Sequence, residues 1–214
     1  MEFLPKKIEQ YSCQHTQEES TVLAELNRET WAKVLIPRML SGHLQGRTLS
    51  MLSKMIRPKT ILEIGTYTGY SAICLSEGLQ TNGILHTIDI NEELKSMCQY
   101  YFEKANISKQ VCQHTGNALN IIPSIEGSFD LVFIDADKEN YSNYFDLVID
   151  QLSMGGFIIA DNVLWSGKVV EDEDKNDLET KALKDFNKKM HQSERVENIL
   201  LPIRDGLMVC RKIK

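Results

Sequence analysis

Acidic and amide side chains follow two short apolar runs in the second half of the chain. Asp135 comes directly after residues 129–134, and Asp161 and Asn162 follow residues 157–160. If the two runs are neighbouring parallel strands, their carboxyl ends meet at one rim of the sheet and bring these oxygens together. Two carboxylates and an amide oxygen suit a hard divalent cation, Mg²⁺ first and Ca²⁺ or Mn²⁺ as alternatives. The competing interpretation is an ordinary Asp-Asn turn and a helix cap.

A lysine, Lys138, lies three residues after Asp135, where a helix is expected to begin. The helix dipole disfavours a cation at that end, so a decorative surface lysine is not favoured there. Beside a bound metal, a lysine can act as a general base and take a proton from a hydroxyl. We therefore predict Lys138 and Asp135 as catalytic residues. The alternative is that Lys138 only anchors the substrate or pairs with Asp137 or Glu139.

A glycine-containing turn follows another apolar run in the segment 61–71, which reads ILEIGTYTGYS. Gly65 allows a sharp turn and a close approach of a ligand to the backbone, and Gly69 opens the next helix. The spacing differs from the Gly-x-Gly-x-x-Gly pattern of dinucleotide sites, because Tyr67 stands where the second glycine would be. The pattern therefore disfavours NAD.

Acidic residues lie at the ends of this expected strand and of the next one. Glu63 would face an amine better than a phosphate, and Asp89 is well placed to accept hydrogen bonds from both hydroxyls of a ribose. A tight turn and a helix cap would explain each feature alone. Their combination favours a nucleoside ligand that carries an amine.

The elements expected to position these residues alternate between short apolar strands and amphipathic helices. The expected strands are 61–64, 84–90, 129–134, 157–160 and 207–210, and the expected helices are 43–56, 91–105, 141–152 and 178–190. The first forty residues read as helical, with a capping box at 16–19. The alternation predicts an α/β fold with a doubly wound, mostly parallel sheet. We expect one domain over 1–214, with an N-terminal helical segment (1–57) and a Rossmann-like core (58–214).

Composition narrows the class of protein. The chain has 214 residues with a net charge of −6, which disfavours nucleic acid and anionic membranes as partners without excluding tRNA. The five cysteines include no Cys-x-x-Cys pair and predict reduced thiols in a cytoplasmic protein. No leader-like or membrane-spanning apolar run is present. Neither the five histidines nor the cysteines show ligand-like spacing, which predicts no zinc site.

Five segments together resemble the metal-dependent caffeoyl-CoA O-methyltransferase family and, more distantly, catechol O-methyltransferase. They are ILEIGTYTGYS, TIDIN, FIDADKENY, ADNVLWSG and LPIRDGLMVCRKIK, in this order along the chain. The resemblance covers the chain from Met39 to the C-terminus and suggests a bacterial member. It implies a seven-stranded class I methyltransferase fold, S-adenosylmethionine as co-substrate and a homodimer.

The resemblance also implies roles for individual positions. Asp135, Asp161 and Asn162 match the metal ligands of the family, and Lys138 matches the base of the catechol enzyme. Glu63 matches the methionine amine contact, Asp89 the ribose contact and Ala118 the adenine side. The positions that match cofactor contacts are Met39, Ser41, Glu63, Gly65, Tyr67, Ser71, Asp89, Ala118, Asp135, Asp137 and Tyr144.

The implied reaction is methylation of one hydroxyl of a small catechol-like molecule. Arg204 departs from the plant pattern, and the acidic segment 171–174 would repel a coenzyme A thioester if it faced the substrate, so plant specificity is not transferred. A solvated surface loop is the simpler interpretation of that segment. The alternatives are a tRNA 5-hydroxyuridine O-methyltransferase, a non-catalytic nucleotide-binding module and, least favoured, a nicotinamide dehydrogenase.

Overall fold

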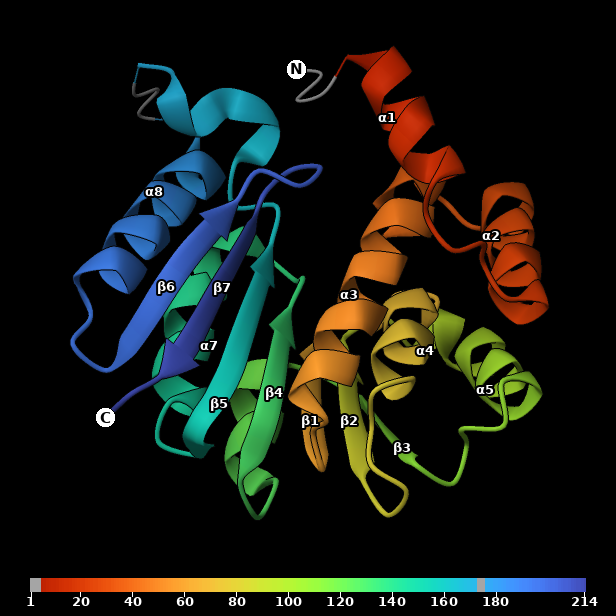
Figure 1. Cartoon of the computed structure of the whole chain (residues 1–214). Helices are drawn as coiled ribbons and strands as arrows, with labels where there is room; N and C mark the ends of the chain where they lie inside the picture. Colours follow the sequence, from red (N-terminus) through yellow and green to blue (C-terminus); the bar gives the residue numbers. More distant parts are fainter. Residues whose placement is uncertain (1–4, 173–175) are drawn as a thin grey trace.

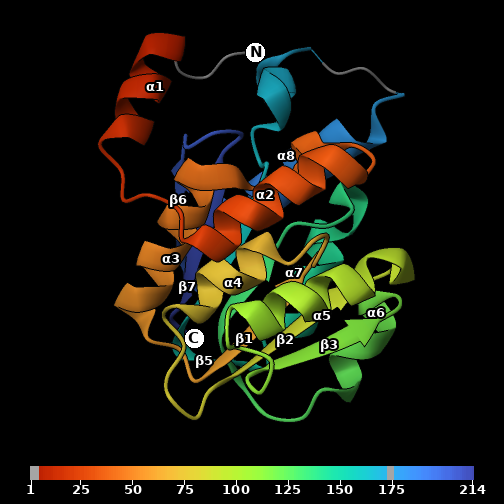
Figure 2. The ribbon, with the colours of Figure 1, turned by 90° about the vertical axis from the view of Figure 1, so that its right-hand side faces the viewer.

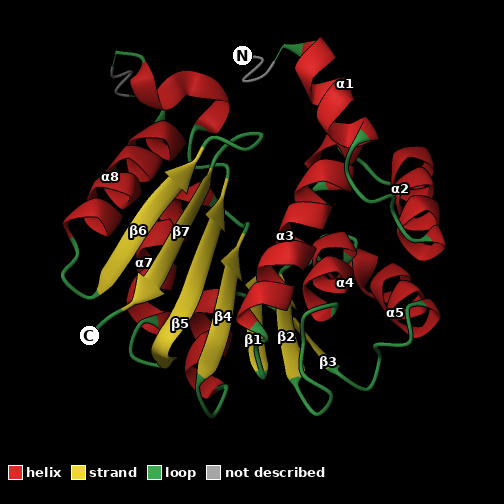
Figure 3. Ribbon diagram, in the orientation of Figure 1, coloured by secondary structure: helices red, strands yellow, loops and turns green. Residues whose placement is uncertain are grey.

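A seven-stranded sheet forms the centre of the molecule in the computed structural model, which describes residues 5–172 and 176–214. The strand order is β3-β2-β1-β4-β5-β7-β6, and only β7 runs antiparallel to its neighbours. The strands are β1 (Thr60–Ile64), β2 (Ile84–Asp89), β3 (Val111–Thr115), β4 (Phe129–Ile134), β5 (Leu152–Asp161), β6 (Val196–Leu201) and β7 (Leu207–Lys212). This order confirms the predicted doubly wound, mostly parallel fold (Figure 3).

Helices cover both faces of the sheet (Figure 1). The α-helices are α1 (Lys6–Gln14), α2 (Thr21–Lys33), α3 (Gly42–Ile56), α4 (Tyr70–Ser76), α5 (Lys95–Lys104), α6 (Ala118–Ile121), α7 (Tyr141–Val148) and α8 (Leu178–Gln192). Short 3-10 turns are η1 (Pro37–Met39), η2 (Glu92–Leu94), η3 (Ile122–Ser124), η4 (Lys138–Asn140) and η5 (Trp165–Val170). None of the helices in the described part of the chain is long and apolar enough to cross a membrane.

The two faces of the sheet have separate cores because successive strand residues point to opposite sides. Leu131 and Phe133 of β4 pack with α3, α4 and α5, whereas Val132 and Ile134 pack with α7 and α8. All four side chains are fully buried, which is why this strand reads as a continuous apolar run. Figure 2 shows α2 outside the layer formed by α3, α4 and α5, where it contacts α4 and α5.

The predicted capping box at 16–19 is wrong. The Thr16 hydroxyl donates to the carbonyl of Ser12 at the end of α1, so it closes one helix and does not open the next. Helix α2 begins instead after Ser20, whose hydroxyl accepts a hydrogen bond from the amide of Leu23. Ser20, and not Thr16, is therefore the N-cap of α2.

Other boundaries also differ from the predictions. Helix α7 ends at Val148, and β5 begins at Leu152, well before the predicted residue 157. The earlier start of β5 was not predicted, because the pair Gly155 and Gly156 is typical of a turn. The predicted helix 91–105 is a 3-10 turn, capped by Asn91, that runs into α5.

Strands β3 and β6 were not predicted. They lie at the two edges of the sheet and carry polar residues among the apolar ones. An edge strand is not buried on both faces, so it lacks the apolar run by which the central strands were recognised.

Candidate functional site

The strand order places the predicted residues on one rim of the sheet. Strands β1, β4 and β5 are consecutive neighbours, and all three run parallel (Figure 1). Glu63 lies near the carboxyl end of β1, Asp135 directly follows β4, and Asp161 ends β5. Ligands of open α/β sheets bind outside the carboxyl ends of the strands, so this rim is the candidate active site.

Lys138 connects the predicted metal ligands. Its ammonium Nζ lies 2.9 Å from Asn162 Oδ1 and 3.2 Å from Asp135 Oδ1. Its third partner, at 2.6 Å, is the hydroxyl of Tyr141, which itself donates to the backbone carbonyl of Asp161 at 2.9 Å. Lys138 is only 6% exposed, so it is a buried site residue and not a surface lysine. Tyr141 was missed by the sequence analysis, although it closes the FIDADKENY segment.

Asp161 is buried next to a second acid. Burial and then the neighbouring charge of Asp135 raise the pKa of the Asp161 carboxyl. Its Oδ1 accepts from the amide of Asn162 at 2.7 Å, which fits the left-handed backbone of Asn162 (φ 58°). The cost of two close carboxylates is reduced when a cation lies between them.

Two further residues of this cluster come from distant parts of the chain. The amide of Gln45, in α3, donates to Asp161 Oδ2. Arg204 donates through Nη1 to Gln45 Oε1 at 2.7 Å and to the carbonyl of Ser41. Gln45 is 1% exposed and reads in the sequence as an ordinary helix residue, so no pattern could have identified it. Arg204, noted as a departure from the plant pattern, therefore positions a side chain that holds Asp161.

These donors fit a hard divalent cation. One oxygen of Asp135 and one of Asn162 both accept hydrogen bonds from the ammonium of Lys138. Burial and the charge of Asp135 disfavour the ionised form of the nearby Asp161 carboxyl, and a bound cation would offset this cost. All the donors are oxygens, the set that Mg²⁺, Mn²⁺ and Ca²⁺ prefer.

Glu63, in β1, lies in the neighbouring part of the rim. It is fully buried, and burial raises the pKa of its carboxyl to about 8, although the hydroxyls of Ser71 and Thr87 oppose the shift. Thr87 donates to Oε2 at 2.5 Å, whereas Oε1 is buried without a hydrogen-bond partner among the described residues. A buried acceptor without a partner is costly, and a ligand amine would satisfy it. Ser71 lies in the first turn of α4, also buried.

Asp89 closes the glycine turn. Its Oδ2 accepts from the amide of Tyr67 at 2.7 Å, and its Oδ1 accepts from the amide of Asn91 at 2.8 Å. The carbonyl of Asp89 accepts from the amide of Gly116 at 2.8 Å, which brings the start of α6 and Ala118 to the same rim.

The remaining predicted contacts lie around these groups. Tyr144, buried in α7, donates through its hydroxyl to Asp137 Oδ1 at 2.5 Å. Met39 is exposed in η1, and Ser41 is buried just before α3, where its carbonyl meets Arg204. Asp137, which accepts from Tyr144, directly precedes Lys138 in the chain. Ser41 is connected to the Asp161 side chain through Arg204 and Gln45.

Replacing Gly65 by alanine is expected to be strongly destabilising. Gly65 has φ +104°, and an added Cβ would lie 1.9 Å from the carbonyl oxygen of Asp135. Gly127 is a matched control, because its φ is +103° and no atom of the described residues lies within 4 Å of its Cβ position. Gly127→Ala should lower the free energy of unfolding by about 1 kcal/mol through backbone strain. Gly65→Ala should cost a further ~1–3 kcal/mol through the clash. Urea denaturation measures both, and equal losses would contradict the steric argument.

One cluster of potential metal ligands was not indicated by the spacing of histidines and cysteines in the sequence. His86, Cys112 and His114 gather on β2 and β3, with one ligand atom from each within 4.8 Å of the others. The spacing along the chain does not indicate this cluster, because the pairing of β2 with β3 brings His86 next to Cys112 and His114.

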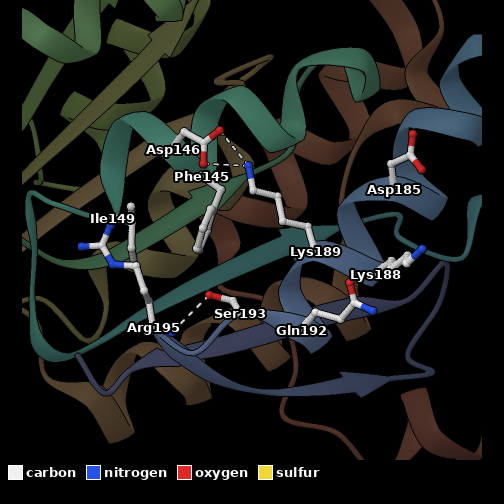
Figure 4. Close-up of a pocket in the computed structure, with 9 residues that line it drawn as sticks. All are labelled: Phe145, Asp146, Ile149, Asp185, Lys188, Lys189, Gln192, Ser193 and Arg195. Atoms are coloured by element: carbon white, nitrogen blue, oxygen red, sulfur yellow. Dashed lines mark hydrogen bonds and ion pairs between the residues drawn. The ribbon is translucent and has the colours of Figure 1, made fainter.

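The acidic segment 171–174 falls partly on residues 173–175, which lie outside the described residues. A groove between α7 and α8 is shown in Figure 4, and Lys189 pairs there with Asp146 at 2.6 Å. None of the residues lining this groove belongs to the predicted site.

Comparison with known proteins identifies the family of this chain. The O-methyltransferase family model matches residues 13–213. Caffeoyl-CoA O-methyltransferase 1 of Zea mays is 36% identical over 198 residues, which are 87% of this chain and 77% of that protein. The caffeoyl-CoA O-methyltransferase of Medicago sativa is 35% identical, with 87% and 80% covered.

Solved structures match over nearly the whole fold. The O-methyltransferase from Bacillus cereus, in complex with SAH (S-adenosylhomocysteine), has a TM-score of 0.89 at 29% identity and covers 96% of this chain and 97% of its own. The SAH-bound Podospora anserina methyltransferase has a TM-score of 0.89 at 27% identity, with 99% and 98% covered. The chain therefore belongs to the O-methyltransferase family, in the S-adenosylmethionine-dependent class of enzymes.

Proposed function

We propose that this enzyme transfers the methyl group of S-adenosylmethionine to one hydroxyl of a small catechol-like molecule, with a divalent cation at Asp135, Asp161 and Asn162. The observation that carries the proposal is the position of Lys138 Nζ, 3.2 Å from Asp135 Oδ1 and 2.9 Å from Asn162 Oδ1. A proton acceptor and a hard ligand set in one place suit the activation of a hydroxyl.

Glu63 and Asp89 are the proposed anchors of the co-substrate. The buried Oε1 of Glu63 has no partner within the described residues and would accept from the methionine amine. Asp89 would accept from the ribose hydroxyls, and Ala118 would line the adenine. The other proposed contacts are Met39, Ser41, Gly65, Tyr67, Ser71, Asp135, Asp137 and Tyr144. The relatives from Bacillus cereus and Podospora anserina, whose structures hold SAH, support this assignment.

Lys138 is the proposed general base. A divalent cation bound beside it supplies Lewis acidity toward the substrate oxygens. Lys138 takes the proton of the acceptor hydroxyl. The acceptor oxygen then forms a bond to the methyl carbon while the bond from that carbon to sulfur breaks, which leaves S-adenosylhomocysteine and the methyl ether. Tyr141 holds Lys138 in position through its 2.6 Å hydrogen bond.

Methyl transfer from labelled S-adenosylmethionine tests the proposal. The acceptors are catechol, caffeoyl-CoA and tRNA from a strain lacking the gene, each with Mg²⁺ and with EDTA. We expect transfer to catechol that requires Mg²⁺. Transfer to tRNA alone would replace the small-molecule proposal, and no transfer to any diol would overturn it. The homodimer implied by the resemblance and the cytoplasmic location predicted from the cysteines stay predictions.

The affinity for S-adenosylmethionine is expected to rise with pH up to about pH 8. The pKa of Glu63 is about 8, so below that pH the carboxyl must lose its proton before it pairs with a cationic amine. The affinity should rise by at most about tenfold per pH unit between pH 6 and 8 and then level off. The raised pKa also means that the free protein loses stability as the pH rises from the ordinary value of 4.5 through about 8.

Calorimetry in buffers of different ionisation enthalpy measures the effect. The wild type should release a proton on binding below pH 8, and Glu63→Gln should bind more weakly without that release. An affinity that does not depend on pH, with no proton released, would show that Glu63 does not contact the amine.

A further inference from the structure

The edge of the sheet carries three metal-binding side chains that the proposed reaction does not use. His86 lies in β2, and Cys112 and His114 lie in β3. His86 and Cys112 are direct partners across the two strands, and His114 is two residues further along β3. Residues at that spacing point to the same side of a sheet, so all three side chains share one face.

The distances suit a single small ion. His86 Nδ1 and His114 Nε2 lie 3.1 Å apart, and the three ligand atoms all lie within 4.8 Å of one another. Zinc binds histidine nitrogen at about 2.0–2.1 Å and cysteine sulfur at about 2.3 Å, which puts two nitrogens of a tetrahedral site about 3.3 Å apart. The nitrogens are therefore already at the spacing that a shared ion requires.

The chemistry of the three groups is that of a borderline-soft cation. All three side chains are half-buried, so water and ions can reach them. Burial lowers the pKa of both imidazoles, and for His86 the neighbouring His114 adds to the effect. Neutral rings offer the lone pairs that a metal needs, and a thiolate prefers zinc to the hard cations.

We propose that His86, Cys112 and His114 form a second metal site, which binds Zn²⁺ with water or an external ligand in the fourth position. It is distinct from the all-oxygen site at Asp135 and lies on the other side of β1. The bound ion would fasten the edge strand β3 to β2. Because Asp89 ends β2 and its carbonyl accepts from Gly116 directly after β3, the ion would also brace the loop beside the proposed ribose contact.

Cobalt titration tests the site in the intact protein. The protein is stripped with chelator and desalted, and excess Mg²⁺ is then added to occupy hard oxygen ligands. Co²⁺ should bind with one equivalent that gives thiolate-to-metal charge transfer and intense tetrahedral absorption, both abolished by Zn²⁺. Cys112→Ser should remove the charge-transfer band and weaken Zn²⁺ binding by about 100-fold or more, since a direct ligand outweighs outer-shell partners worth 10–100-fold. Cys13→Ser is the control and should change neither.

Alkylation of the wild type keeps the test independent of variant folding. Cys13 and Cys112 are both half-buried free cysteines, which makes them a matched pair. Zn²⁺ should slow the reaction of iodoacetamide with Cys112 at least tenfold and leave Cys13 unchanged, as read by peptide mass spectrometry. Absence of the charge-transfer band together with unprotected Cys112 would overturn the proposal and leave His86 and His114 as a simple hydrogen-bonded pair. Both readouts are independent of methyl transfer.

Discussion

Lys138→Ala is expected to lower kcat by about 10²–10⁴-fold, the usual range for loss of a positioned general base. Binding of S-adenosylmethionine should stay nearly intact, because Lys138 makes no hydrogen bond to the proposed anchors Glu63 and Asp89 in the described structure and pairs, among the proposed co-substrate contacts, with Asp135 alone. The loss should shrink as the pH rises, since more of the acceptor hydroxyl ionises without help. Lys138→Arg should not restore activity, because a guanidinium stays protonated at working pH.

Steady-state kinetics across pH separate this role from simpler ones. Lys212 is a matched control, because it is also a buried lysine, 8% exposed, and it donates only to the carbonyls of Ile149 and Leu152 within the described structure. Lys212→Ala should lower the Tm and leave kcat of the folded enzyme unchanged. A raised KM with preserved kcat in Lys138→Ala, together with an active arginine variant, would make Lys138 a substrate anchor instead of a base.

Removal of divalent cations is expected to abolish methyl transfer. EDTA should stop the reaction, and Mg²⁺, Mn²⁺ and Ca²⁺ should restore it to different degrees, because the proposed ligands are all oxygens. Mg²⁺ at about 100 times its Kd should stabilise the folded protein by about 2.7 kcal/mol. For a chain of this size that corresponds to a rise in Tm of roughly 5–10 °C.

Asp161→Asn should lose both the activity and the Mg²⁺-dependent rise in Tm. Asp146→Asn is the control, because Asp146 is an exposed residue of α7 paired only with Lys189 among the described ion pairs. It should keep both responses. Full activity of the wild type in chelator, with no effect of Mg²⁺ on the Tm, would show that Asp135, Asp161 and Asn162 are structural.

Much of the central sheet and of its rim could be predicted from the amino-acid sequence. Strands β1 and β4 were recognisable because each is buried on both faces and therefore reads as an apolar run. Once those runs were assigned to parallel neighbours, the residues after each strand had to meet at one edge. The amino-acid sequence therefore predicts that Asp135 and Asp161 lie close together.

Tertiary structure alone decided the partners that reach this rim from elsewhere. Gln45 and Arg204 lie 159 positions apart in sequence, yet their side chains meet at 2.7 Å and hold Asp161. No periodicity encodes such a contact, because it depends on how α3 docks on the sheet.

The cluster of His86, Cys112 and His114 also depends on tertiary structure. The edge strand β3 was not recognised, since an edge strand mixes polar and apolar residues and lacks the signal of a buried one. Without that strand, nothing in the sequence could place Cys112 opposite His86. The features that could be predicted from the sequence are those that depend on burial and on local turns. The Gln45–Arg204 contact and the cluster at His86 depend on helix docking and on strand register, which arise from packing between distant parts of the chain.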